Sequence, residues 1–75
     1  MNALKIKNWC DANITPMAWQ RVVMKNLDSF KMKGWGISEM SNPDESINLD
    51  AAMTEAVKAT IKELYQMEIP EAVLV

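Results

Sequence analysis

The sequence predicts a small, mainly α-helical domain of three helices, the last of them the longest. Apolar residues recur three and four positions apart in residues 15–30 and again in residues 48–68, the spacing of one helix face. Turn-forming residues gather between these stretches, around the two glycines and in a linker at residues 42–47. A chain of 75 residues has room for one domain, so we expect residues 1–75 to fold as one unit.

The first helix is expected from a cap at Asn2 to about residue 11. Ile6, Trp9 and Cys10 fall on one helical face, because they lie three and four positions apart. A strand is the alternative, since apolar residues and lysines alternate in ALKIK. The alternation stops at Asn8, which favours the helix.

A turn at Asn13 and a second helix over residues 15–30 are expected next. Thr15 is a good helix cap, and the fixed φ of Pro16 suits a first helical turn. The stripe that supports this helix consists of Trp19, Val22, Val23, Leu27 and Phe30. Its end is open, because apolar residues and lysines also alternate over 30–33, and a short hairpin turning at residues 34–36 is the alternative.

The third helix is expected over residues 48–68, followed by an apolar tail at 69–75. Asn48 is the expected cap, and Asp50 suits the positive end of the helix dipole. Pro70 prevents continuation of the helix. The expected apolar stripe consists of Met53, Val57, Ile61 and Leu64.

Charge is divided unequally along the chain. Residues 1–36 carry six basic and two acidic residues, whereas residues 37–75 carry two basic and eight acidic residues, within a net charge of −2. A basic half is compatible with a nucleic-acid partner. The alternative is that the two halves simply attract each other.

The sequence lacks the residues that most enzymes and metal sites require. It has no His and only Cys10, which excludes the usual zinc ligand sets and His-dependent nucleophiles, and its glycines form no phosphate loop. We therefore expect no enzyme, metal, cofactor or small-molecule substrate. No run approaches the ~18 apolar residues of a membrane span and no signal peptide is evident, so we expect a cytoplasmic protein without a membrane partner.

Residues 13–19 resemble the turn and second helix of small helix-turn-helix phage regulators of the Cro repressor type. Those proteins often have Gly, a β-branched residue, Ser or Thr, two variable positions and two small or apolar residues. The matching residues here are Asn13, Ile14, Thr15, Pro16, Met17, Ala18 and Trp19. The resemblance implies that Ile14 fills the space between two helices and that Thr15 caps the second. The chain departs from the pattern at Asn13, where Gly is usual, and at Trp9, where a small residue is usual.

A regulator of this kind would read DNA with the outward face of the second helix. Gln pairs well with adenine and Arg with guanine, and lysines bind phosphates. The predicted DNA-binding residues are Thr15, Met17, Gln20, Arg21, Lys25, Lys31 and Lys33. A hairpin over residues 30–39 would resemble the wing of excisionase-like winged helices, with Trp35 at its tip; the alternative is that Trp35 fills the core.

A homodimer is expected, because so short a chain has a small core of its own. The predicted interface residues are Trp35, Met53, Val57, Ile61, Leu64, Ile69 and Val73. The tail is expected to pack on a second subunit or, alternatively, on its own core. The leading hypothesis is a sequence-specific DNA-binding regulator of the kind that phages and mobile elements encode. The alternative is a module that inhibits or adapts a host protein through the acidic helix, Trp35 and the tail.

Overall fold

The computed structural model describes all of residues 1–75 and contains six helices with almost no extended structure. The mainly α fold class is confirmed, although the chain divides into more helices than expected. The helices are α1 (Ala3–Asn13), α2 (Ala18–Lys25), α3 (Leu27–Met32), α4 (Ile37–Ser41), α5 (Ala51–Tyr65) and α6 (Glu71–Leu74).

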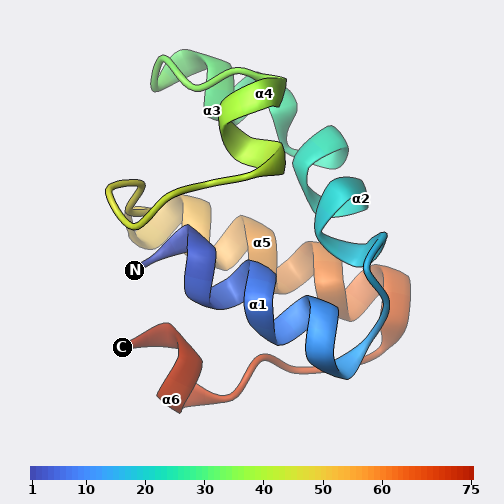
Figure 1. The fold of residues 1–75 in the computed structure, drawn as a ribbon. Coiled ribbons are helices and arrows are strands. Elements are labelled where there is room, and N and C mark those ends of the chain that lie inside the picture. The colour runs from blue at the N-terminus through green and yellow to red at the C-terminus, as the bar shows by residue number, and fades with distance from the viewer.

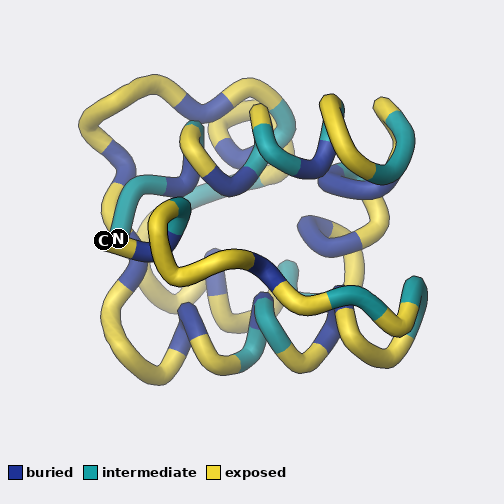
Figure 2. Tube along the Cα trace, turned by 90° about the horizontal axis from the view of Figure 1, so that it is seen from below, coloured by how far each residue is buried: buried dark blue, intermediate teal, exposed yellow.

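Helix α2 is the central element of the packing. It contacts α1, α4 and α5, while α6 packs on α1 (Figure 1). The two chain ends lie close together on one side of the molecule in both Figure 1 and Figure 2. The Lys5 ammonium group, 3.3 Å from the carbonyl oxygen of Val75, joins these two ends.

Helix α1 forms as the spacing of its apolar residues predicts, and the strand alternative is wrong. The side chain of Asn2 caps it by accepting a hydrogen bond from the Lys5 amide at 3.2 Å. Ile6 and Cys10 are fully buried. The helix runs through Asn13, whose side-chain amide donates to the Trp9 carbonyl, so the expected turn begins one residue later, at Ile14.

The single helix expected over residues 15–30 is wrong, because the chain bends at Asn26 between α2 and α3. The Asn26 side chain donates both to the carbonyl of Val22 and, at 3.1 Å, to the Thr60 hydroxyl on α5. Its bond to Val22 uses an acceptor within the helix, which is the way Asn commonly interrupts helices. Apolar spacing alone does not reveal such a break.

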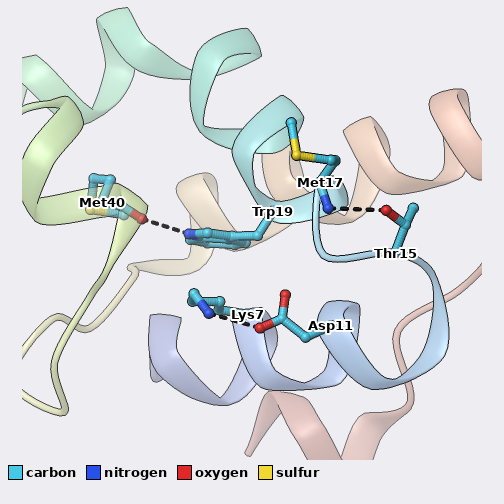
Figure 3. Close-up of polar contacts among 6 residues, drawn as sticks. All are labelled: Lys7, Asp11, Thr15, Met17, Trp19 and Met40. Atoms are coloured by element: carbon cyan, nitrogen blue, oxygen red, sulfur yellow. Dashed lines mark hydrogen bonds and ion pairs between the residues drawn. The ribbon is translucent and has the colours of Figure 1, made fainter.

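Helix α2 also begins later than expected. The Thr15 hydroxyl accepts a hydrogen bond from the Met17 amide at 3.0 Å, and the Thr15 carbonyl accepts from Ala18 at 3.0 Å. These bonds close a turn in front of the helix, as Figure 3 shows for Thr15 and Met17. Thr15 therefore stabilises the turn that leads into α2 and does not cap its first residue.

No hairpin wing forms over residues 30–39. Helix α3 continues to Met32, Gly34 adopts a φ of +86° in the turn that follows, and α4 begins at Ile37. Phe30 is fully buried, which anchors α3 as a helix on the core. The Glu39 carboxylate accepts from the Gly36 amide at 3.1 Å and fixes the start of α4.

The expected linker at residues 42–47 is a fixed loop that pairs with the N-terminus. The Ala3 amide donates to the Ile47 carbonyl at 3.0 Å, and the Leu49 amide donates to the Met1 carbonyl at 2.6 Å. The only β-bridge, between Asn2 and Asn48, lies here. Asn48 is thus used for pairing, and the predicted cap at this residue is wrong.

Asp50 caps α5 instead, accepting a hydrogen bond from the Met53 amide at 2.8 Å. The helix ends at Tyr65, earlier than expected, because Gln66 adopts a left-handed conformation with φ of 55°. Pro70 then starts the short helix α6. The predicted 48–68 helix is therefore correct in type and too long at both ends.

One hydrophobic core joins all of these elements, and buried residues alternate with exposed ones along each helix in Figure 2. Trp19 is 1% exposed, and its indole N–H donates to the Met40 carbonyl at 2.6 Å (Figure 3). This bond ties α2 to α4. Since Trp19 and its buried neighbours fix the rotation of α2, they also determine which residues α2 presents to solvent.

Candidate functional site

The candidate site is the solvent-facing side of α2, which a four-residue turn, residues 14–17, places at a steep angle to α1 (Figure 1). Ile14 is half-buried and packs against the core, the position that the helix-turn-helix resemblance implies. The inward side of α2 is fully committed to the core through Ala18, Trp19, Val22 and Val23.

The outward side of α2 carries polar and apolar residues together. Met17 is 57% exposed and Met24 is 52% exposed, while Arg21 between them is exposed and Gln20 is half-buried. Methionine is flexible and polarisable, and is common on adaptable contact surfaces. Helical spacing predicts that Met17, Gln20 and Arg21 face outward, and the structure places Met24 on the same side.

A small groove lies beside this face, between α2 and α5. It has a volume of about 240 Å³ and is lined by Gln20, Arg21, Met24, Lys25 and Leu64. Arg21 links the two helices at this groove, because its guanidinium Nη1 donates to the Tyr65 hydroxyl at 3.3 Å. We call these five lining residues the α2–α5 groove.

The predicted phosphate-binding lysines are not gathered into one patch. Lys25 lies 3.6 Å from the Glu63 carboxylate, and Lys33 lies 3.0 Å from the carboxylate of Asp50. Glu63 and Asp50 stand near opposite ends of α5, roughly 20 Å apart along its axis at about 1.5 Å per residue. Lys31 is exposed on α3 and makes no ion pair.

Most of the predicted dimer interface belongs to the core of the single chain. Met53, Val57 and Ile61 are at most 6% exposed, so they leave no surface for a second subunit. The tail also folds onto its own domain, with Ile69 and Leu74 buried.

The remaining interface candidates are only partly available. Trp35 and Val73 are half-buried and pack against the core. This agrees with the alternatives that Trp35 fills the core and that the tail packs on its own domain. Leu64 is half-buried and lines the α2–α5 groove. Of the predicted interface set, Leu64 alone takes part in the candidate site.

Cys10 lies on the side of α1 that faces the core and is fully buried. Burial, with a smaller contribution from neighbouring Asp11, raises the pKa of its thiol to about 11. The group is therefore protonated at neutral pH. The chain has no cluster of three or more His, Cys, Asp or Glu side chains placed to hold a metal ion.

Two larger hollows lie on the other side of α5. The larger, about 590 Å³, is open to solvent between α5 and the tail, and its rim mixes carboxylates with Lys58 and Lys62. The second, about 350 Å³, lies between the start of α5 and α6.

No helix has both the length and the apolar character needed to cross a bilayer.

The sequence does not indicate that Tyr65 and Glu63 border the candidate site. Tyr65 lies 44 positions from Arg21 in the chain, so no spacing rule links them. The unequal division of charge was the one available signal. The ion pairs between α5 and the basic half agree with the alternative that the two halves of the chain attract each other.

No protein-family model, curated protein or solved structure matches this chain.

Proposed function

We propose that the domain is a non-enzymatic protein-interaction module that binds its partner through the outward face of α2 and the α2–α5 groove. The observation that supports this most is that Met17, at the N-cap of α2, and Met24, within α2, are both more than half exposed, while the other side of the helix is fixed in the core. Met and Arg are enriched, and Lys depleted, where proteins bind each other. This surface replaces the one expected from the acidic helix, Trp35 and the tail, because Trp35 and the tail pack internally.

The ion pairs of the predicted phosphate-binding lysines favour a protein partner over nucleic acid. Lys25 and Lys33 each have a carboxylate within 4.0 Å, so phosphates approaching them also meet Glu63 and Asp50. DNA-binding surfaces are much more positive than protein-binding ones. We further propose that the protein acts in the cytoplasm, where an unpaired, reduced thiol such as Cys10 is usual.

Peptide display tests this function directly. Random peptides selected on the wild-type protein are re-tested on Met24→Lys, which places a charge in the groove, and on Met32→Lys, the same substitution at a more exposed methionine of α3. We expect the selected peptides to lose binding to Met24→Lys and to keep binding to Met32→Lys. Peptides that bind all three proteins alike would contradict the proposal, provided that circular dichroism shows all three folded.

A second candidate function is sequence-specific DNA binding, as in phage regulators, by a monomer or a homodimer. The specific observation in its favour is the four-residue turn before α2, which leaves Gln20 and Arg21 accessible at a corner between two helices. The exposed ion pairs of Lys25 and Lys33 are each worth no more than about 1 kcal/mol, so phosphates can compete for these lysines.

A salt titration with random duplex DNA tests this candidate. Phosphate contacts predict an affinity that falls with salt, with a log–log slope of roughly −0.9 for each phosphate neutralised. Arg21→Ala should weaken binding, whereas Lys58→Ala, the same loss of one charge on the far side of α5, should not. Absence of binding at low salt would contradict DNA recognition.

A further inference from the structure

We infer that the α2–α5 groove receives an acidic amphipathic helix of the partner protein, an inference that depends on the proposed interaction function. The groove runs between two helices and is bordered by Met24 and Leu64, one from each. A third helix can lay an apolar ridge into such a groove, which is the packing mode of helical bundles and of helix-in-groove recognition.

The size of the groove favours side chains over a small molecule. Its volume of about 240 Å³ is below the roughly 300–1,000 Å³ typical of small-ligand pockets. It is also open to solvent, and Met24 on its border is 52% exposed. One or two apolar side chains from a partner helix would cover it, with Met24 adjusting to their shape.

The charge on the rim defines the rest of the partner. The Arg21 guanidinium makes one hydrogen bond, to the Tyr65 hydroxyl, and is exposed, so its remaining N–H groups are available to a carboxylate. A planar guanidinium binds a carboxylate through two parallel bonds. Lys25 adds a second positive charge, partly offset by Glu63. The net positive rim around an apolar floor is complementary to a helix with apolar anchors flanked by Glu or Asp.

A second copy of the chain fits this site poorly. Three of the four exposed carboxylates of its long helix and tail are paired within the molecule, Glu55 with Lys58, Glu63 with Lys25 and Glu68 with Lys62, and the fourth, Glu71, lies on the four-residue helix α6. The apolar side of α5 is buried in its own core. The chain therefore offers no acidic helix with a free apolar side, and the partner is a different protein.

The test compares two helical peptides of about 16 residues, or roughly four turns. Both carry Leu at positions three and four apart, flanked by Glu in one peptide and by Lys in the other. Affinities are measured for the wild type, for Arg21→Glu, and for the matched control Lys58→Glu, which reverses a charge away from the groove. Random duplex DNA and the protein's own sedimentation are measured in the same buffer.

We expect the Glu peptide to bind the wild type and Lys58→Glu about tenfold more tightly than the Lys peptide does, and Arg21→Glu to reverse this preference. Equal binding of both peptides, or a preference unchanged in Arg21→Glu, would overturn the inference. Self-association blocked by Arg21→Glu would overturn it in favour of a second copy. Arg21-dependent binding of DNA without binding of either peptide would overturn both the inference and the proposed function.

If display instead yields Met24-dependent peptides that are not acidic, the inference fails and the interaction function stands.

Discussion

Thr54 and Thr60 are two threonines of α5 with opposite environments. The Thr54 hydroxyl oxygen is buried and has no hydrogen-bond partner. The Thr60 hydroxyl donates to the Ala56 carbonyl at 2.8 Å and accepts from the Asn26 side chain at 3.1 Å. A buried hydroxyl lowers stability unless it is hydrogen-bonded, so the two residues should respond differently to the same substitution.

Replacing each threonine by valine, which has almost the same shape, tests this difference. Thr54→Val should raise the free energy of unfolding by about 1 kcal/mol, because it removes an unpaired polar group. Thr60→Val should lower it by roughly 1–2 kcal/mol, because it breaks the link between Asn26 and α5. Urea denaturation measures both. A loss of stability in Thr54→Val equal to that in Thr60→Val would show that Thr54 has a partner.

Cys10 makes stability depend on alkaline pH. Its pKa is about 11 in the folded protein against 9.0 ordinarily, so the folded state holds the proton more tightly. This contribution is complete below pH 9 and is lost as the pH rises towards 11, by at most roughly 3 kcal/mol. Cys10→Ala should therefore lose less stability than the wild type over this range. Parallel pH curves for the two proteins would contradict the raised pKa.

The tail shows, at the scale of the element, how a few contacts decide where a segment lies. Leu74 is buried against the domain, while neighbouring Val75 is 83% exposed. Helix α6 has four residues and is too short to be stable alone, so its contacts with α1 hold it in place.

Leu74 and Val75 are both aliphatic, but only Leu74 is buried, so truncating each to alanine shows how much the packing of the tail contributes to stability. Leu74→Ala should lower the free energy of unfolding by about 2 kcal/mol, near the low end for buried leucines because Leu74 remains 7% exposed. Val75→Ala should change it by less than about 0.5 kcal/mol. Thermal melts of the two variants provide the measurement. If Leu74→Ala melted like the wild type while dissociating a dimer, the tail would be an intersubunit arm.

The difference between local properties and contacts between distant residues explains which elements the sequence can predict. Helices α1 and α5 follow from apolar spacing and polar caps, both local properties. The bend at Asn26 depends on Thr60, 34 positions away, and the use of Asn48 depends on pairing with Asn2. Local patterns do not reveal such distant partners. For this reason the predicted second helix is too long, and the cap predicted for the third helix is the wrong residue.

At the scale of the whole molecule, the sequence located the outward face of α2 but not what surrounds it. Helical spacing places Gln20 and Arg21 on one side, whereas the groove exists only because α5 brings Leu64 and Tyr65 beside them. The acidic half of the chain likewise reaches the basic half through Lys25 and Lys33. Folding thus converts a basic segment into a small, partly neutralised face with an apolar groove.

The methionine methyl groups report most directly on whether this face is the binding surface. In protein labelled with ¹³C at the methionine methyls, addition of the Glu peptide should shift the NMR signal of Met24, which lines the groove, and to a smaller extent that of Met17, the exposed N-cap residue of α2. Met32, which is 87% exposed but lies on α3, should not move. A Met24 signal that stays in place at saturating peptide, or a Met32 signal that moves as far as that of Met24, would contradict binding at the α2–α5 groove.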